Sequence, residues 1–227
     1  MALLLNIDTA TEHAGVCLAE DEKVLALQET YEQKSHASFI QLAIKQVMAD
    51  AGKRLRDIDA VAISAGPGSY TGLRVGLATA KGLCYALHKP LIMISSLEIM
   101  ALASIIAEKS PHKAGFLFCP MIDARRMEVF TALYNAQLDI VMPPVAIILD
   151  ETSFGAELAG HTIAFSGSGS KKAQIITHQN AVFSSLTHSV SHMTALSTKA
   201  YKASLFADLA YSEPFYLKEF YKPIKKN

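Results

Sequence analysis

One stretch decides the fold: Ala62-Ile-Ser-Ala-Gly-Pro-Gly-Ser-Tyr-Thr-Gly-Leu-Arg-Val-Gly-Leu-Ala-Thr-Ala-Lys-Gly-Leu83. It predicts a strand, a glycine-rich loop and a helix in succession. Residues 61–65 are few and apolar, as in a buried strand, and the glycines and proline at 66–68 end that run. Ser69 or Thr71 can cap the helix that follows. A loop of this kind presents backbone N–H groups and the positive end of a helix dipole, which suits a phosphate group.

The expected helix over residues 71–88 carries apolar side chains on two faces. One face holds Leu73, Leu77, Ala80, Leu83, Cys84 and Leu87, and the other holds Val75, Ala78, Gly82 and Ala86. A surface helix usually has a single apolar stripe, so this helix is expected to be packed on two sides. The second side could be covered by the rest of its own domain or by a partner chain, and the pattern does not decide between them.

The composition is that of a globular chain with a large core. The 227 residues are 51% hydrophobic and their formal net charge is zero. This balance does not indicate strong nucleic-acid binding, which needs a concentrated basic surface. Three cysteines lie far apart with no C-x-x-C pair, which predicts buried thiols in a reducing, cytoplasmic setting. The N-terminus lacks the basic region of a signal peptide, and the most apolar run, residues 91–107, is too short and too polar to cross a membrane.

The hydrophobic pattern divides the chain into two lobes, residues 1–110 and 111–227. In the first lobe we expect strands at 3–8, 15–19, 24–31, 58–65 and 91–94, and helices at 35–51, 71–88 and 97–108. The second lobe is smaller and less regular, with strands at 115–122, 127–134, 145–149 and 162–165, helices at 171–177 and 196–209, and an extended tail at 213–218. The two halves show no visible sequence repeat.

Three points that suit a phosphate are widely separated in the sequence. They are Asp8 and Thr9 after the first strand, the loop with Gly66, Gly68, Ser69 and Thr71, and a second loop with Gly167 and Gly169. Asp8 could hold Mg²⁺ beside a nucleotide phosphate, or it could only form an Asx turn with the backbone two residues on. With the opening three-strand meander, these points are typical of an α/β fold of the actin, hexokinase and Hsp70 type, which is a two-lobed, ribonuclease H-like architecture.

Six blocks of sequence carry a sharper resemblance. They are Ile7-Asp-Thr-Ala-Thr11, Gly66-Pro-Gly-Ser-Tyr-Thr-Gly-Leu-Arg-Val-Gly76, Ala80-Lys-Gly-Leu83, Ile94-Ser-Ser-Leu97, Ile122-Asp-Ala-Arg-Arg-Met-Glu-Val129 and Glu213-Pro-Phe-Tyr-Leu-Lys218. Together they closely resemble the bacterial TsaB (YeaZ) family of TsaD/Kae1-like proteins. The resemblance covers nearly the whole chain, although residues 143–191 are poorly diagnostic.

The resemblance implies a non-catalytic subunit that works with the larger paralogue TsaD and the ATPase TsaE. Together these proteins transfer the threonylcarbamoyl group from threonylcarbamoyl-AMP to N6 of adenosine 37 in tRNAs that read ANN codons. TsaD binds a metal through two histidines in a segment resembling Asn-His-Leu-Glu-Gly-His, and Ser96 and Met100 stand at those two places here. Neither suits a hard or borderline metal ion. We therefore expect no catalytic residue, metal or cofactor of its own, with ATP or ADP only at a junction with a partner.

The resemblance also places the contact with TsaD on the two helices of the first lobe. Helix 35–51 has apolar side chains over about half of its circumference, which is wider than an ordinary surface stripe. The expected interface residues are His36, Phe39, Ile40, Ala43, Ile44, Val47, Leu73, Leu77 and Lys81. The same surface is expected to join two copies when TsaD is absent, while TsaE and tRNA are reached only through the complex and no membrane is involved. The alternative is that both helices are buried in their own lobe.

A second hypothesis is a free-standing phosphotransferase or ATPase that binds nucleotide with Asp8 and the two glycine loops. It predicts that the isolated chain binds ATP or ADP.

Other residues give weaker indications of a functional site. Arg125 and Arg126 could bind a phosphate or only form a turn, Ser69 lacks the G-x-S-x-G pattern of a hydrolase nucleophile, and five of the eight histidines, His188 among them, are expected on the surface.

Overall fold

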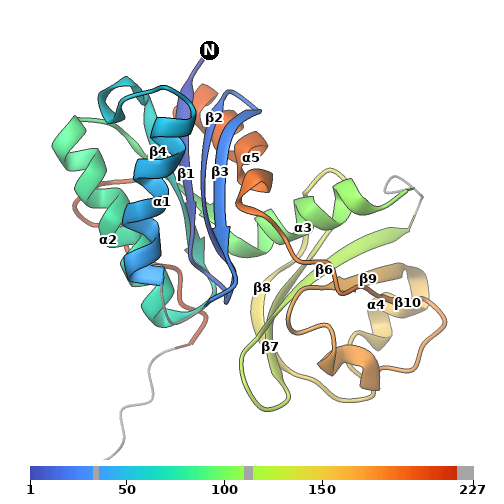
Figure 1. Ribbon diagram of the computed structural model, residues 1–227. Helices are drawn as coiled ribbons and strands as arrows, with labels where there is room; N and C mark the ends of the chain where they lie inside the picture. The colour runs from blue at the N-terminus through green and yellow to red at the C-terminus, as the bar shows by residue number, and fades with distance from the viewer. Residues whose placement is uncertain (33–35, 110–114, 219–227) are drawn as a thin grey trace, which may run out of the picture.

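The computed structural model describes residues 1–32, 36–109 and 115–218, which form two five-stranded sheets, one in each lobe (Figure 1). The strand order of the first sheet is β3-β2-β1-β4-β5. Its strands are β1 (Leu3–Asp8), β2 (Ala14–Glu20), β3 (Lys23–Thr30), β4 (Ala60–Gly66) and β5 (Leu91–Ser95). The first three form the predicted antiparallel meander, and β4 and β5 run parallel to β1.

The second sheet repeats this arrangement, with the strand order β8-β7-β6-β9-β10. Its strands are β6 (Phe116–Asp123), β7 (Glu128–Tyr134), β8 (Ile140–Ile148), β9 (Thr162–Ser166) and β10 (Ala181–Phe183). Again three antiparallel strands are followed by two that run parallel to the first of them. Both lobes therefore share one topology without a visible sequence repeat, and the predicted two-lobed fold is confirmed.

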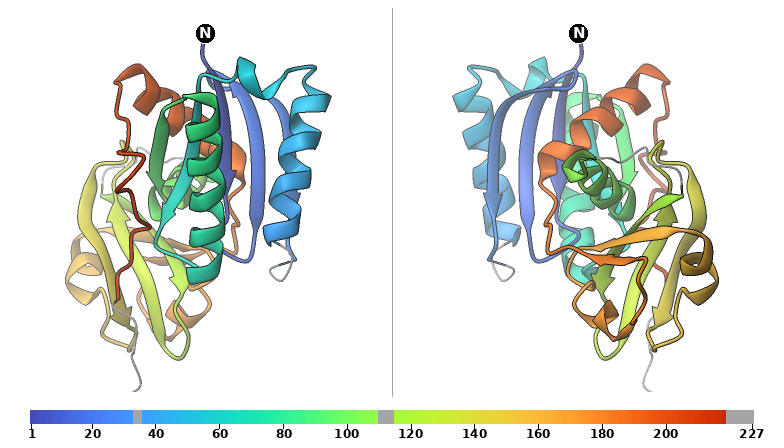
Figure 2. Two further views of the ribbon diagram at one scale, coloured as in Figure 1. Left: turned by 90° about the vertical axis from the view of Figure 1, so that its left-hand side faces the viewer. Right: turned by 90° about the vertical axis from the view of Figure 1, so that its right-hand side faces the viewer.

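Helices cover both faces of the first sheet (Figures 1 and 2). One face carries α1 (His36–Asp50) and α2 (Tyr70–Leu87), and the other carries α3 (Ser96–Ala107) and α5 (Met193–Lys202). Helix α3 also packs against β6, β7 and β9, so it lies between the two lobes. The short α4 (Gly155–Gly160) covers the second sheet from the side opposite α3. Within the described residues, every helix is too short or too polar to cross a lipid bilayer.

The alternation of side chains along β1 explains these layers. Leu3, Leu5 and Ile7 point into the core beneath α1 and α2, whereas Leu4 points into the core beneath α5. Complete burial of such a side chain contributes about 1.5–3 kcal/mol relative to leaving it in water. The apolar side chains on both faces of β1 therefore stabilise both layers, as expected for a central strand with helices on each side.

The last helix differs from the prediction in its place and its length. The sequence pattern assigned it to the second lobe, but α5 packs against β1 and β5 of the first sheet. It ends at Lys202 instead of residue 209. The helix stops because Ser204 adopts a left-handed backbone conformation (φ 54°) and Ala207 then pairs with Leu91 at the edge of β5.

Smaller differences lie in the second lobe. The predicted strand 145–149 is the end of the longer β8, and the predicted helix 171–177 is a 3₁₀ helix, Lys172–Ile175. Helix α4 and strand β10 correspond to no predicted element. The expected lobe boundary near residues 110–113 falls outside the described residues.

An extended C-terminal tail (residues 205–218) runs from α5 back across both lobes (Figure 2). Its backbone N–H groups donate to the carbonyl oxygens of Leu91 and Ala65 in the first sheet, at 2.8 and 2.7 Å. Lys81 of α2 donates from Nζ to two of its carbonyl oxygens, at 3.0 and 3.1 Å. Its last described residue, Lys218, forms an ion pair with Glu128 of the second sheet. The tail therefore connects the sheet and helix α2 of the first lobe to the second lobe.

Candidate functional site

The cleft between the lobes brings together the segments that the sequence marked as suited to phosphate. Two cavities lie in it. Cavity 1, of about 270 Å³, is lined by Thr11, Glu12, Met100, Gly167, Ser168, Ser170, Lys171, Ser185, Thr187 and His188. Cavity 2, of about 340 Å³, is lined by Ala10, Thr11, Glu12, Gly68, Ser69, Tyr70, Thr71, Ile122, Asp123, Ala124, Arg125 and Phe130. These segments meet because β1 and β4 of the first sheet and β9 of the second sheet all end at this cleft.

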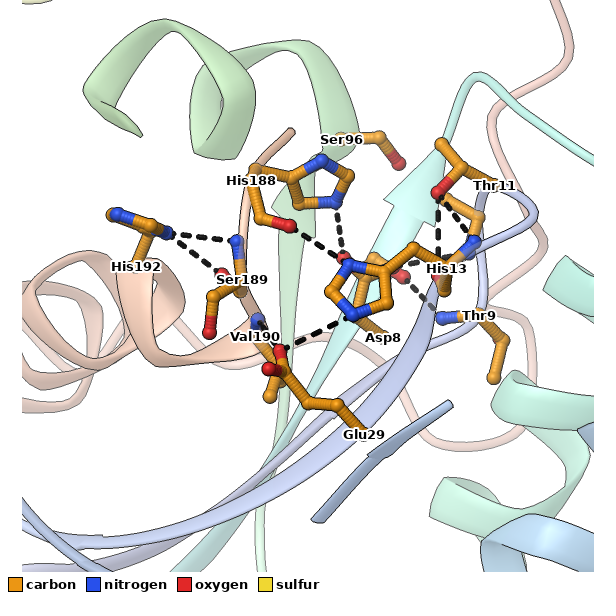
Figure 3. A network of polar contacts seen from close by, with 12 residues as sticks. Asp8, Thr9, Thr11, His13, Glu29, Ser96, His188, Ser189, Val190 and His192 are labelled. Atoms are coloured by element: carbon orange, nitrogen blue, oxygen red, sulfur yellow. Dashed lines mark hydrogen bonds and ion pairs between the residues drawn. The ribbon is translucent and has the colours of Figure 1, made fainter. Parts of the chain in front are cut away.

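Asp8, at the end of β1, is buried and ion-paired (Figure 3). Its Oδ2 atom lies 2.8 Å from Nε2 of His188, and both side chains are 3% exposed. Its Oδ1 atom accepts the backbone N–H of Ala10 at 3.0 Å, which is the Asx turn that the sequence allowed. Burial alone would raise the pKa of Asp8, but the hydrogen bond and the charge of His188 lower it below its ordinary value. Both carboxylate oxygens already have partners in the chain, so the arrangement does not fit a direct Mg²⁺ ligand.

His188 is held in turn by a second buried histidine, His13 (Figure 3). The Nδ1–H group of His13 donates to the carbonyl oxygen of His188 at 2.8 Å, and its ring stacks on Tyr31 with centroids 4.3 Å apart. Its Nε2 atom lies 3.6 Å from Oε1 of Glu29, which also accepts the N–H of Val190 at 3.0 Å. The segment that arrives from the second lobe is thereby fixed to β3. No local motif marks this network, because its two histidines are 175 residues apart, and the expectation that His188 lies on the surface was wrong.

The glycines of the first loop allow close packing between α2 and the end of β1. A Cβ atom on Gly68 would lie 2.1 Å from the carbonyl oxygen of Ala10, and one on Gly72 would lie 2.1 Å from that of Thr9. The Ala10 carbonyl oxygen also accepts the N–H of Ser69 at 2.6 Å, and the Ser69 hydroxyl caps α2 by accepting the N–H of Gly72 at 3.3 Å. Two N–H groups at this helix start are thus already bonded within the chain, so the loop is less suited to a phosphate than its sequence indicates.

The other loop glycines also face protein atoms. A Cβ atom on Gly66 would lie 2.6 Å from the carbonyl oxygen of Phe215 in the C-terminal tail. In the second loop, a Cβ atom on Gly167 would lie 2.6 Å from the carbonyl oxygen of Met121, and one on Gly169 would lie 2.9 Å from the Met121 Cβ atom. These glycines are explained by packing, and a nucleotide is not needed to explain them.

Ser96 and Met100 have structural roles in the packing around the two glycine loops. The Ser96 hydroxyl is completely buried and accepts the backbone N–H of Gly66 at 3.1 Å. The methyl group of Met100 packs against Gly167, where an added Cβ atom would come within 2.2 Å of it. Across the described part of the chain, no three His, Cys, Asp or Glu side chains are grouped in a way that could hold a metal ion.

Most of the predicted interface residues are in the core of the first lobe. Ile40, Ala43, Ile44, Val47 and Leu77 are at most 7% exposed and pack together against the first sheet, and Leu73 is 1% exposed. Phe39 is partly buried against the same core, and Lys81 is bonded to the C-terminal tail. His36 begins α1, but its side chain lies outside what the structure describes. The prediction that these six core residues contact a partner was therefore wrong in detail. The wide apolar arc of α1 is explained by its packing on both the sheet and α2.

The exposed face of α1 and α2 consists of other residues. We call it the outer helix face and define it by Leu42 of α1 and by Ala78, Gly82, Tyr85 and Ala86 of α2, all of which are exposed. Leu42 is 69% and Tyr85 79% exposed, and a Cβ atom on Gly82 would have no neighbour within 4 Å. The chain itself therefore gives no packing reason for a glycine at position 82.

Comparisons with known proteins agree with this fold and these motifs. The family model described as TsaD, tRNA N6-adenosine threonylcarbamoyltransferase, matches residues 26–222. The tRNA threonylcarbamoyladenosine biosynthesis protein TsaB of Bacillus subtilis is 34% identical over 149 residues, which are 64% of this chain and 62% of that protein. The TsaB protein of Escherichia coli is 36% identical over 133 residues, which are 58% of this chain and 54% of that protein. The matches thus span less than two thirds of the length of these relatives.

A solved structure from Pseudomonas aeruginosa, titled YeaZ, has 22% sequence identity and a TM-score of 0.79, and the match covers 96% of this chain and all of that one. At this identity the match shows a shared fold. The family model, by contrast, covers most of the present sequence. Proteins named TsaB and YeaZ match more than half of the chain, and the chain belongs to the TsaD family.

Proposed function

We propose that this chain is a non-catalytic subunit that supports formation of threonylcarbamoyladenosine at position 37 of tRNA. In this role it acts with TsaD and TsaE, which transfer the threonylcarbamoyl group from threonylcarbamoyl-AMP to N6 of adenosine 37 in tRNAs that read ANN codons. The names of the B. subtilis and E. coli relatives support a place in this process. The chain contacts tRNA only through the complex.

One observation carries the proposal that the chain is not the catalyst. Ser96 and Met100 occupy the places of two metal-binding histidines, and both are used for packing around the glycine loops. A hydroxyl that already accepts a backbone N–H and a thioether methyl in van der Waals contact are poor ligands for a hard or borderline metal ion. The other candidate metal ligand was Asp8, and its carboxylate is already paired with His188.

The outer helix face is the surface that we propose for TsaD, and for a second copy of this chain when TsaD is absent. The residues of this face take the place of the interface residues predicted from the sequence, most of which are buried in the core. Its exposed apolar side chains, Leu42 and Tyr85, resemble the aromatic and aliphatic anchors of protein interfaces. Gly82 and its alanine neighbours would let a partner backbone approach α2 closely. We place ATP or ADP at the junction with this partner and not on Asp8, because Asp8 is already paired.

The alternative of a free-standing ATPase or phosphotransferase is less well supported. It requires Asp8 and both glycine loops to receive a Mg²⁺-nucleotide, but the carboxylate is ion-paired and the glycines pack against the chain itself. Calorimetric titration of the isolated chain with Mg²⁺-ATP separates the two proposals, since only the ATPase requires heat of binding at micromolar nucleotide.

The direct test is modification of tRNA in vitro with TsaD and TsaE, with and without this chain. We expect Tyr85→Glu to abolish co-purification with TsaD and to reduce modification to the level seen without the chain, because a buried unpaired carboxylate destabilises an interface. Ile106→Glu, on α3 and 64% exposed, is the matched control and should retain both activities. Full modification by TsaD and TsaE alone, or normal TsaD binding by Tyr85→Glu, would contradict the proposal.

A further inference from the structure

Cavity 1 has His188 in its wall, and one nitrogen of this buried ring has no partner among the described residues. His188 uses Nε2 for the ion pair with Asp8, and its other ring nitrogen, Nδ1, points to the opposite side of the ring (Figure 3). Among the described residues, Nδ1 has no hydrogen-bond partner, although His188 is only 4% exposed. Nδ1 is not among the fully enclosed unpaired polar atoms of the described residues, so it is open to the cavity and can bond a ligand there.

The charge state of His188 decides which ligand fits. Burial would lower the pKa of His188, but the hydrogen bond and charge of Asp8 raise it above the ordinary value. In the protonated ring, both nitrogens carry a hydrogen atom, so Nδ1 is a donor. The matching ligand atom is an acceptor, and a negatively charged oxygen makes the strongest bond to it.

The other walls of cavity 1 supply further donors. Lys171 is exposed at its edge, and Ser185 and Thr187 add hydroxyl groups for which no partner is described. Glu12 lies in the wall as well and opposes a high negative charge. The cavity, at about 270 Å³, is slightly smaller than the usual range for ligand sites, which begins at about 300 Å³. A small oxyanion therefore suits it better than a nucleoside triphosphate.

From these contacts we infer that cavity 1 binds a small oxyanion, a phosphate or a carboxylate, between His188 and Lys171 without a metal ion. The imidazolium of His188 takes the place that a divalent cation would have beside Asp8. This site lies in the cleft and is separate from the outer helix face, so its test does not depend on the proposed function.

The proposal predicts a characteristic pH dependence. The groups around His188 are Asp8, Glu12, Glu29, His13, His192 and Lys171, and the three carboxylates favour its protonated form. Loss of the His188 proton removes the Nδ1 donor, so the affinity for the oxyanion falls as the pH rises through the pKa of the folded state. We expect a loss of at least about tenfold once the pH exceeds the folded pKa of His188 by one unit or more.

The experiment is a titration of the full chain with inorganic phosphate and, separately, with acetate, followed by nuclear magnetic resonance of the backbone amides and the His188 ring. We expect saturable shifts at residues of cavity 1 that persist in EDTA, and the anion that binds more tightly identifies the ligand as phosphate or carboxylate. Lys171→Ala should weaken binding roughly fivefold, because an exposed cation contributes modestly. Lys53→Ala, which removes an exposed lysine at the opposite end of the first sheet, is the control and should bind normally.

His188→Gln retains an amide donor for Asp8 but cannot become charged, so it should remove the pH dependence. If this variant does not fold, Lys171→Ala and the pH series still decide the question. The inference is overturned if neither anion shifts the cavity residues at millimolar concentrations, if binding requires Mg²⁺, or if Lys171→Ala and Lys53→Ala bind equally well.

Discussion

Two alanine substitutions in one helix test whether the glycines of α2 serve internal packing or an external contact. Gly72 lies in the first turn of α2, where a Cβ atom would come within 2.1 Å of the Thr9 carbonyl oxygen. Gly82 lies nearly three turns later, where a Cβ atom would have no neighbour within 4 Å. The two changes add the same methyl group to the same helix, and only its surroundings differ.

The magnitudes follow from two opposing terms. Replacing glycine by alanine inside a helix is favourable by about 1 kcal/mol. Overpacking costs about 1–3 kcal/mol or more, and at Gly72 the upper end applies because the contact is with backbone, which cannot move away by changing rotamer. We therefore expect Gly72→Ala to lower the free energy of unfolding by about 2 kcal/mol and Gly82→Ala to raise it by about 1 kcal/mol. For a chain of this size, 1 kcal/mol corresponds to roughly 2–4 °C in the unfolding midpoint.

Urea unfolding followed by circular dichroism measures both variants against the wild type. A Gly72→Ala variant as stable as Gly82→Ala would refute the close packing of α2 on β1. Binding to TsaD adds a second readout, because Gly82→Ala should stabilise the isolated chain and yet weaken the complex if the outer helix face is the interface. Equal TsaD binding by wild type and Gly82→Ala would show that position 82 is not close to the partner.

Three further predictions concern the core and the buried ion pair. Leu77→Glu should lower the free energy of unfolding by about 4 kcal/mol or more, because it places a charge in the core. Tyr85→Glu should instead leave the free energy of unfolding within about 0.5 kcal/mol of the wild type. Thermal unfolding of both variants measures this difference. The raised pKa of His188 adds stability that is complete below about pH 6.5 and is lost as the pH rises through the pKa of His188 in the folded state. The lowered pKa of Asp8 adds stability that is complete above about pH 3.9 and is lost as the pH falls through the pKa of Asp8 in the folded state. Wild type should therefore be most stable relative to Asp8→Asn between about pH 4 and pH 6.5, which denaturant unfolding over a pH series measures. Burial raises the pKa of Cys17 and of Cys119 to about 12 and that of Cys84 to about 11, so none of the three thiols should react with a disulfide reagent at pH 8 until the chain unfolds.

Each of these predictions has an outcome that contradicts it. A folded, stable Leu77→Glu variant would mean that this side chain is not in the core. Parallel pH profiles of wild type and Asp8→Asn would mean that the ion pair does not contribute to stability in this range. Rapid labelling of a cysteine in the native chain, with the unfolded chain as the reference for complete reaction, would mean that the core around that thiol opens readily.

Local signals in the sequence predict the elements of the first lobe well. Ser69 caps α2 as expected, and the helix runs over Tyr70–Leu87, close to the predicted 71–88. The meeting of Asp8 with the first glycine loop was also predictable, because they follow β1 and β4, which are parallel neighbours and end at the same edge of one sheet. These inferences need only the period of the hydrophobic pattern and the chemistry of turns.

Contacts between distant residues could not be predicted in this way. The partner of Asp8 is 180 residues away, and its histidine has no motif around it. A helical wheel shows how wide an apolar arc is, but not which neighbour covers it, so Ile40 and Leu77 were assigned to a partner although their own sheet covers them. The run of apolar residues after Lys202 resembles a continuing helix until the pairing of Ala207 with β5 is known.

The C-terminal tail has a mechanical consequence. It is one of several passages of the chain between the lobes, together with α3 and the segment before α5, and its ion pair at Lys218 anchors the far end. Kinases that close around a nucleotide need a hinge that opens freely, but here the tail is fastened to α2 and to the first sheet, so hinge bending would separate Lys218 from Glu128 of the second sheet. We therefore expect the two lobes to move as a single block, so that a force applied to α2 by another subunit is passed directly to the far lobe.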